Sequence, residues 1–340
     1  MPKSVIEGPY LADLLEQPTA LQRACKGLAD IPQLRAARPE RIVLTGMGSS
    51  QFALYPLSLH LIAHGFEAHL VETAELIHYQ PTLLREGTLL ITASQSGRSA
   101  EIVRLMESVG PEITVVGITN DKKSPLAQRS DFCLYLDAGP ESTVSCKTYL
   151  NSLVVLDWLA AVITGNELQQ KRSELHLAAE AVAKYLDAWK EHVSEMMVLS
   201  ERIERIFVTG RGPSLAAART GGLILKESTR FAAEGMSCAA FRHGPLEALG
   251  PNVLVTICEG DSKTAELNRT LARDVESGGG RVAILGPSSV RAACYWHEVS
   301  AAIRNVMEIL PIQMLSLALA ARIGREAGRF EKATKITSTE

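Results

Sequence analysis

An internal repeat is the feature that most restricts how this chain can fold. The segment RIVLTGMGSS, residues 41–50, matches RIFVTGRGPS, residues 205–214, and the corresponding glycines Gly48 and Gly212 lie 164 residues apart. The same offset aligns TLLITASQSGRSAEI with NVLVTICEGDSKTAEL, in which the second copy holds one extra residue. A repeat of this length predicts two copies of one supersecondary unit, joined in tandem.

Each copy alternates short apolar runs with longer helical patterns. The order is strand, glycine turn, helix, strand, polar loop, helix, strand, which predicts a parallel sheet covered by helices. Between the copies, alanine, glutamate, lysine and leucine recur at helical spacing. We therefore expect an N-terminal helical segment (1–40), a first domain (41–165), a connecting helix (166–202), a second domain (203–325) and a C-terminal tail (326–340).

The composition fits a soluble globular protein and argues against several partners. The hydrophobic content of 46% and the charged content of 21% are ordinary for globular domains. The net charge of -3 gives no basic excess that could displace counterions from a nucleic acid. The longest apolar runs, such as SLVVLDWLAAVI, are too short or too interrupted for a membrane span. The N-terminus has no signal-peptide core, so we expect a cytoplasmic protein.

The cysteines and histidines do not suggest a metal site. The six cysteines lie far apart and form no C-x-x-C pair, and the chain has no H-E-x-x-H motif. These cysteines fit reduced core thiols of a cytosolic protein better than a disulfide framework. We therefore expect neither a metal nor another cofactor.

Two polar loops follow apolar strands in the first copy and each precedes a helical pattern. They are TGMGSS and TASQSG, within residues 45–50 and 92–97. Small residues allow backbone N–H groups and hydroxyls to approach an anion, and a helix N-terminus adds partial positive charge. Neither loop has the spacing of a nucleotide-binding motif. For one such loop alone, an ordinary helix cap remains the better explanation.

Comparison of the two copies changes that balance. In place of Ser94-Gln95-Ser96-Gly97 the second copy has Cys258-Glu259-Gly260-Asp261. Two carboxylates at this point would repel an anion and would offer it no donors. We therefore predict one anion site per chain, in the first copy, and expect the second copy to supply other groups.

The same segments carry a family resemblance. Gly-x-Gly-x-Ser, SQSG, a V-x-x-K element and the run LILKESTRFAAEGMSCAAFRHGPLEAL together resemble the sugar isomerase (SIS) domain family. That family includes the isomerase half of glucosamine-6-phosphate synthase, SIS-type glucosamine-6-phosphate deaminases and ketose/aldose phosphosugar isomerases. The resemblance extends from about Arg41 to the C-terminus. It implies two tandem SIS domains, each a flavodoxin-like parallel sheet within a three-layer α/β/α sandwich.

The resemblance also implies roles for particular residues. Carried over by matching position, the residues that bind the sugar phosphate are Gly48, Ser49, Ser50, Ser94, Gln95, Ser96, Ser99, Val144 and Lys147. The proton-shuttling base is Glu227, the ring-opening histidine is His243, and the C-terminal lysine that closes over the sugar is Lys335. In the synthase the neighbouring subunit contributes this histidine, so the resemblance implies a homodimer with shared active sites.

Plain structural explanations stand beside these roles, and the chain departs from the family pattern. Without the resemblance, Glu227 is an exposed helix residue, His243 caps a turn and Lys335 belongs to a frayed cationic tail, where Lys332 competes for its role. Ile224 replaces the first of two family lysines. The family's V-A-x-T-K appears one residue short, and the proline and leucine that usually precede the terminal lysine are missing.

Taken together, the sequence predicts a phosphosugar isomerase or deaminase that moves a proton between C1 and C2 of an amino-sugar or ketose 6-phosphate. Glucosamine 6-phosphate and fructose 6-phosphate are the examples. Two alternatives stay open, a non-catalytic phosphosugar-binding regulator and a deglycase of fructosamine 6-phosphates. The first copy begins near residue 41, so we expect no glutaminase domain and no transfer of ammonia from glutamine.

Overall fold

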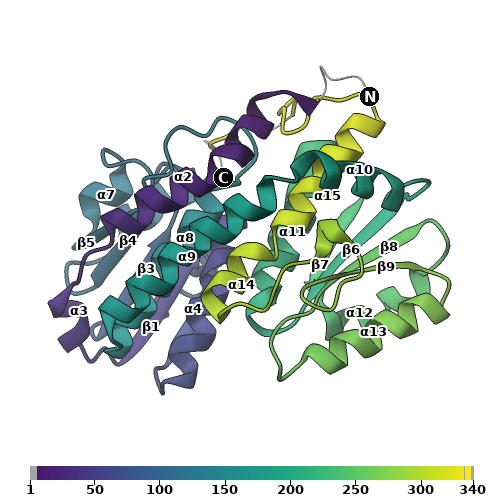
Figure 1. Cartoon of the computed structure of the whole chain (residues 1–340). Helices are drawn as coiled ribbons and strands as arrows, with labels where there is room; N and C mark the ends of the chain where they lie inside the picture. The colour runs from purple at the N-terminus through teal and green to yellow at the C-terminus, as the bar shows by residue number, and fades with distance from the viewer. Residues whose placement is uncertain (1–5, 333, 338–340) are drawn as a thin grey trace. The chain divides into compact units, whose positions relative to one another are not determined.

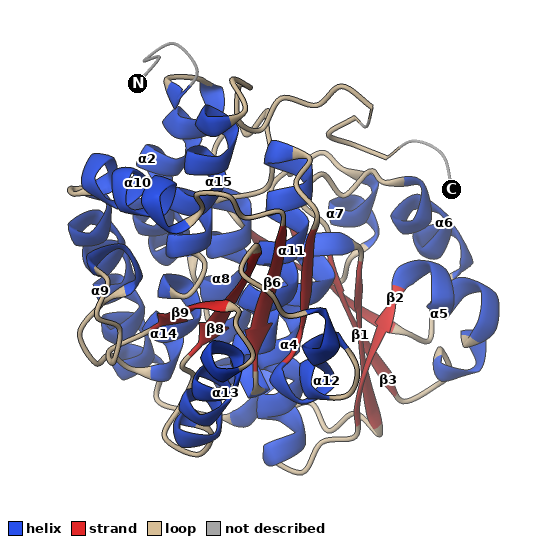
Figure 2. Cartoon of the chain, turned by 90° about the vertical axis from the view of Figure 1, so that its right-hand side faces the viewer, coloured by secondary structure: helices blue, strands red, loops and turns tan. Residues whose placement is uncertain are grey.

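The computed structural model describes residues 6–332 and 334–337 and divides into two compact units. The first-half unit contains Thr19–Glu141, Cys146–Leu177 and the tail from Glu331. The second-half unit contains Ala178–Phe330, Ser142–Ser145 and the chain up to Pro18. Figure 1 labels the helices and strands, and Figure 2 shows the strands of both sheets in red among helices in blue.

The first-half unit is built on a parallel five-stranded sheet with the order β2-β1-β3-β4-β5. Its strands are β1 (Arg41–Gly46), β2 (Ala68–Glu72), β3 (Thr88–Ala93), β4 (Thr114–Thr119) and β5 (Phe132–Tyr135). Its helices are α3 (Pro32–Ala36), α4 (Gly48–Ala63), α5 (Thr73–Tyr79), α6 (Ala100–Ser108), α7 (Pro125–Arg129) and α8 (Lys147–Thr164), preceded by α2 (Pro9–Gly27). The predicted fold class is confirmed here.

Alternating residues place the core of this unit on both faces of the sheet. Val43, Leu90 and Val115 come from three neighbouring strands and share one face. They form a buried cluster with Ile102 and Leu105 of α6. Residues of the same strands that point the other way are also buried, which is the burial pattern of a parallel sheet covered on both sides.

The second-half unit repeats this plan with one strand fewer. Its parallel sheet has the order β7-β6-β8-β9. The strands are β6 (Arg205–Gly210), β7 (Ala233–Ser237), β8 (Val253–Cys258) and β9 (Arg281–Leu285). The helices are α11 (Leu215–Thr229), α12 (Cys238–Arg242), α13 (Ala265–Ser277), α14 (Ala301–Met307) and α15 (Leu310–Arg322). Residues 286–300, which follow β9, form no strand.

Two long helical stretches outside the sheets complete the chain. The predicted connecting segment 166–202 holds two helices, α9 (Leu168–Leu186) and α10 (Trp189–Leu199). The stretch Ala301–Arg322 is long and apolar enough to cross a membrane, but 89% of its most apolar window is buried inside the protein. Core helices of globular proteins have this character.

The repeat extends to the backbone conformation of its loops. Gly48 has φ 52° and its counterpart Gly212 has φ 53°. Gly97 has φ 60°, and Gly260 in the second copy has φ 75°. Residues with a Cβ rarely adopt these left-handed angles. The turn at Gly48 therefore recurs at Gly212, whereas the loops after β3 and β8 place their left-handed glycines at different distances from the strand.

Helix α11 lies against strand β7 at backbone contact. A Cβ at Gly222 of the helix would lie 2.4 Å from the amide nitrogen of Gly235 in the strand. A Cβ at Gly235 would lie 2.2 Å from the carbonyl oxygen of Ala218. Two facing glycines therefore fix how close α11, which carries Glu227, comes to its sheet.

We expect Gly222→Ala to lower the free energy of unfolding by about 1–3 kcal/mol, because backbone atoms of β7 cannot yield to the new methyl group. Gly221→Ala is the matched control, since its Cβ would meet chiefly the end of the Ile312 side chain, at 2.6 Å. The gain in helix propensity offsets that smaller clash. Urea unfolding of both variants checks this. Equal losses of stability would contradict the backbone contact.

Candidate active site

The two hydroxyl-rich loops of the first copy lie side by side at one edge of the sheet. Strand β1 pairs with β3 in parallel, with Gly46 opposite Ala93, so both chains leave the sheet at the same level. The first loop enters α4 and the second enters α6, so each leads to a helix N-terminus. We call Gly48–Ser50 together with Ser94–Ser99 the first cradle. Seven of the predicted phosphate ligands lie in it: Gly48, Ser49, Ser50, Ser94, Gln95, Ser96 and Ser99.

Glycines allow the close approaches within and beside the first cradle. A Cβ at Gly46 would lie 2.8 Å from the carbonyl oxygen of Ala93, at the end of the neighbouring strand. A Cβ at Gly97 would lie 2.3 Å from the Ser124 hydroxyl, and Gly97 has a left-handed φ of 60°. A larger residue at position 46 would push β1 away from the end of β3, and one at position 97 would push the second loop away from Ser124.

Two serine hydroxyls of the first cradle are held by the loop itself. The Ser94 Oγ accepts from the Gly97 N–H at 3.1 Å, and the Ser96 Oγ accepts from the Arg98 N–H at 3.2 Å. Each hydroxyl uses a lone pair in these bonds, so its hydrogen remains for donation. The Asn120 N–H and the Thr119 hydroxyl fix the Gln95 carbonyl oxygen, at 3.0 and 3.2 Å. The loop is therefore arranged to donate hydrogen bonds.

The C-terminal tail reaches the first cradle at the start of α6. The carbonyl oxygen of Thr337 accepts a 3.1 Å hydrogen bond from the N–H of Ala100, the first residue of that helix. Ser99 is the N-cap residue, yet its side chain makes no capping hydrogen bond. The tail thus satisfies one of the helix N–H groups that α6 cannot pair internally.

Lys335 of the same tail is bound by a buried carboxylate. Its Nζ lies 2.8 Å from Oε2 of Glu141, a side chain with no solvent exposure. Glu141 also accepts from the backbone N–H groups of Cys146 and Thr148, at 3.0 and 3.1 Å, and from the Thr148 hydroxyl at 2.6 Å. Each oxygen of this carboxylate therefore has partners.

These partners determine the charge of Glu141. Burial is the largest influence and by itself raises the pKa of the carboxyl group. The positive charge and hydrogen bond of Lys335, together with the bonds from Thr148 and Cys146, outweigh burial and hold the pKa below its ordinary value. The carboxylate is ionised at neutral pH, and loss of Lys335 would leave a buried charge without its counterion.

The remaining two predicted phosphate ligands lie in buried positions. Val144 has no solvent exposure and belongs to the second-half unit. Lys147 begins α8, is fully buried and donates from Nζ to the Pro140 carbonyl oxygen at 2.7 Å. The lysine ammonium therefore supports the loop that ends at Glu141.

Glu227 lies on the last turn of α11 and is partly buried. The next two residues, Ser228 and Thr229, are buried, and their hydroxyls bond back to the carbonyls of Ile224 and Leu225 at 2.6 and 2.5 Å. Ile224 is itself fully buried. The position of the missing family lysine is therefore a core position in this protein.

His243 lies at the surface of the second-half unit, directly after α12. Phe241 is fully buried and meets Phe207 edge to face, with 5.1 Å between ring centroids, which anchors the short helix. Gly244 follows with φ 134°, an angle that only glycine adopts readily. The imidazole is thus presented outward from a fixed turn.

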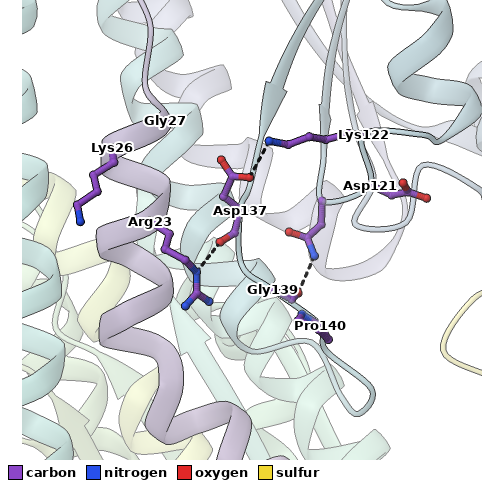
Figure 3. A pocket seen from close by; sticks show the side chains of 9 residues that line it. Arg23, Lys26, Gly27, Asp121, Lys122, Asp137, Gly139 and Pro140 are labelled. Carbon is purple, nitrogen blue, oxygen red and sulfur yellow. Dashed lines mark hydrogen bonds and ion pairs between the residues drawn. The ribbon is translucent and has the colours of Figure 1, made fainter.

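An open pocket of about 810 Å³ lies at the carboxyl ends of β4 and β5 (Figure 3). It is lined by Arg23, Lys26, Gly27, Asn120, Asp121, Lys122, Asp137, Gly139 and Pro140. Lys122 pairs with Asp137 at 3.3 Å, and Arg23 donates to the Asp137 carbonyl oxygen at 3.0 Å. Because Asn120 also binds Gln95, the pocket borders the first cradle. The sequence reasoning did not single out these residues.

Within the described residues no three His, Cys, Asp or Glu side chains come together as a metal site would require. His60 and His64 lie four residues apart on α4 and stack with 4.2 Å between their ring centroids. Burial, with smaller effects of His64 and Lys171, lowers the pKa of His60 to about 4. All six cysteines are free thiols, five of them buried.

The predicted residues thus fall into two sets. The first-half unit holds the first cradle, Lys147 and Lys335, and the second-half unit holds Val144, Glu227 and His243. The sequence reasoning missed Glu141, the residue that binds Lys335. Its segment, AGPES, reads as an exposed turn, so nothing local marks this glutamate as buried.

We expect Glu141→Gln to release the tail, because the variant loses the charge that holds Lys335. The amide oxygen still accepts a hydrogen bond from Thr148, so the loop itself should stay in place. Hydrogen exchange of the Ala100 amide should then quicken by roughly tenfold or more, since exchange reports local opening. Lys332→Ala is the control and should leave this exchange unchanged, because Lys332 is exposed. Unchanged exchange in Glu141→Gln, or an equal change in the control, would contradict the contact.

Comparison with known proteins agrees with this architecture. The sequence model of the SIS domain matches residues 34–162 and 198–320. A glutamine–fructose-6-phosphate aminotransferase (isomerizing) from Pyrococcus horikoshii is 30% identical over 351 aligned residues, which cover 97% of this chain and 57% of that protein. The chain therefore spans somewhat more than half the length of this relative.

Solved structures share the fold at lower identity. The C-terminal domain of glucosamine-fructose-6-phosphate aminotransferase from Francisella tularensis superposes with a TM-score of 0.86 at 21% identity, covering 97% of this chain and 100% of that one. Glucosamine-6-phosphate deaminase from Thermotoga maritima gives 0.81 at 18% identity, covering 98% and 100%. The family model matches most of the sequence, in two copies that coincide with the two sheets. This chain belongs to the SIS domain family.

Proposed function

We propose that this protein is a phosphosugar isomerase or deaminase that acts on an amino-sugar or ketose 6-phosphate, such as glucosamine 6-phosphate or fructose 6-phosphate. The observation that carries the proposal is the first cradle, where two hydroxyl-lined loops meet at neighbouring helix N-termini and the tail with Lys335 lies against one of them. The relatives named as isomerizing aminotransferase and glucosamine-6-phosphate deaminase support a sugar phosphate as the substrate class.

The first cradle suits a phosphate group for electrostatic reasons. Ser94 and Ser96 keep their hydroxyl hydrogens for donation, because their oxygens accept bonds from the loop backbone. The N-terminus of α6 adds N–H groups and partial positive charge. Hydrogen bonds to a charged phosphate are stronger than bonds between neutral groups, so the loop favours the phosphorylated sugar over the free sugar.

The chemistry requires one proton to move between C1 and C2. We assign this step to Glu227, whose carboxylate takes the proton from one carbon, forms the enediol or enolamine, and returns it to the other. His243 exchanges protons with the ring oxygen so that the closed sugar opens. Lys335 covers the open chain. Isomerisation needs nothing further, whereas deamination also consumes water and releases ammonia.

The exposure of His243 supports a homodimer with shared sites. Its turn is rigidly anchored by Phe241 while the imidazole faces outward, as a residue donated to a neighbouring subunit would. In this arrangement each site combines the cradle of one chain with the histidine of its partner.

One observation favours a second candidate function. Ile224 is fully buried where the family carries a lysine, so that lysine's contribution to the reaction is missing here. A non-catalytic phosphosugar-binding regulator would need the first cradle alone. A deglycase of fructosamine 6-phosphates would use the same cradle and the same proton shuttle.

The activity is tested with a panel of hexosamine, ketose and fructosamine 6-phosphates, with separate detection of ammonia, released amine and sugar product. Glu227→Gln should lower kcat by about 10²- to 10⁴-fold, because the amide cannot carry the proton. Binding of the phosphosugar should change little. Undiminished turnover in Glu227→Gln would contradict the assigned step. Release of ammonia would identify a deaminase, release of another amine a deglycase, and isomerisation without either an isomerase. Binding without turnover would favour the regulator.

The phosphate role is tested separately. Ser96→Ala should weaken binding of fructose 6-phosphate by roughly 10- to 100-fold, because a hydrogen bond to a charged group is lost. Ser108→Ala, which removes an exposed hydroxyl at the other end of α6, should have no effect. Isothermal titration calorimetry measures both. Unchanged affinity in Ser96→Ala would remove the first cradle from the phosphate site.

Shared sites are tested by subunit mixing. Glu227→Gln and His243→Ala homodimers should each be inactive. In a heterodimer of the two, one site regains both intact residues, so activity should return to at most half of the wild-type value. No recovery in heterodimers verified by mass spectrometry would show that each site is built from one chain.

A further inference from the structure

The second copy keeps the loop backbone of an anion cradle but lacks its hydroxyl-rich sequence. We call Gly212–Ser214 together with Cys258–Asp261 the second cradle. Gly212 has the left-handed φ of its counterpart Gly48, 53° against 52°, and Gly260 is also left-handed, with φ 75°. The two loops converge, since a Cβ at Gly260 would lie 3.4 Å from the Ser214 hydroxyl. The second copy lacks SQSG, so the group that fills its loop is unrelated to the proton transfer assigned to Glu227.

A carboxyl group of the chain itself lies in the second cradle. Glu308 has no solvent exposure, and its Oε1 accepts a 2.7 Å hydrogen bond from the Ser214 hydroxyl. Its other oxygen, Oε2, is buried and has no hydrogen-bond partner among the described residues. A buried carboxyl group with one unpaired oxygen is costly, so its position needs an explanation.

The repeat supplies that explanation. Ser214 is the counterpart of Ser50 and immediately precedes α11, a helix of 15 residues. Glu308 lies two residues before α15, much as Val144 lies three residues before α8, and the family resemblance places Val144 among the substrate contacts. The carboxyl group therefore lies at a helix N-terminus, where the first copy is expected to bind an oxyanion.

The surrounding charges fit a carboxyl group better than a fully charged anion. Burial raises the pKa of Glu308 to about 7, and Asp261 acts in the same direction. The Ser214 hydrogen bond and the positive charge of Arg304 oppose this shift without cancelling it. Near neutral pH the Glu308 carboxyl group is therefore partly protonated and partly ionised. The protonated form is compatible with the acidic residues of the second cradle.

We propose that Glu308 is a built-in occupant of the second cradle, filling a small oxyacid site that would otherwise be open to a ligand of the size of formate or acetate. This inference does not rest on the proposed function. Ser214 and Glu227 lie at opposite ends of α11, about 20 Å apart along the helix axis, so the two carboxyl groups belong to different sites.

Glu308→Ala should empty the second cradle and let an external acid replace the lost side chain. The variant should unfold at a lower temperature than wild type. Sodium formate should then raise its midpoint in a saturable way, by about 3 to 6 °C at roughly ten times the dissociation constant. The rise should be larger near pH 6 than near pH 8, because the site accepts a protonated acid. Sodium chloride at matched ionic strength is the reference.

Two double variants form a matched control. Ser214→Ala in the Glu308→Ala background removes the donor and should abolish most of the response to formate. Ser50→Ala in the same background alters the first cradle and should leave the response intact. Formate that stabilises Glu308→Ala no more than wild type would overturn the proposal. So would equal rescue of the Ser214→Ala and Ser50→Ala double variants.

Glu308→Gln keeps the inference testable if Glu308→Ala does not fold. The amide has nearly the volume of the carboxyl group, so this variant should fold and show no response to formate. The folded-state pKa of Glu308, about 7, exceeds the ordinary 4.5, so its stabilisation is full below that lower value and is lost as pH rises through about 7. Wild type should therefore lose stability relative to Glu308→Gln between about pH 5 and pH 8. Parallel pH profiles, or a formate response in Glu308→Gln, would overturn the proposal.

Discussion

The parallel pairing of β1 with β3 is the interaction on which the rest of the first-half unit depends. Parallel strands must be joined by crossovers, so every strand delivers its next loop to the same edge of the sheet. Gly46 opposite Ala93 fixes the two cradle loops at one level. The tail, the Glu141 loop and the pocket beside β4 and β5 then add to an edge that the pairing has already defined.

The sequence predicts much of this fold because the repeat constrains it twice. Apolar strands and glycine turns recur at a fixed offset, and the family resemblance gives the order of elements. Among the described residues the second sheet has four strands, and its lack of a fifth could not be predicted from the sequence. After β9, residues 296–299 include a histidine and a glutamate, whereas β5 is apolar. Just before them, Ala293 donates its N–H to Glu195 at 2.8 Å, and its carbonyl oxygen accepts from the Tyr185 hydroxyl at 2.5 Å. These bonds hold residues 292–294 in a 3-10 turn.

The site residues that could not be predicted from the sequence are single buried carboxyl groups. The two hydroxyl-rich loops can be recognised in the sequence because each holds closely spaced small polar residues that can all donate hydrogen bonds. Glu141 and Glu308 are isolated glutamates in unremarkable segments, and only tertiary packing removes them from water. Their partners, Lys335 and Ser214, lie 194 and 94 residues away in the chain. No local pattern encodes such a pairing, whereas Ser94, Ser96 and Ser99 of the first cradle lie within a span of six residues.

The bond between the Thr337 carbonyl and the Ala100 amide has a consequence for ligand affinity. An oxyanion that claims this amide has to displace the carbonyl, so the tail is an intramolecular competitor present at a fixed effective concentration. The observed affinity is then the intrinsic affinity multiplied by the fraction of chains whose tail is detached from α6. Substitutions in the tail around Lys335 and Thr337 can therefore tune ligand binding without any change in the first cradle.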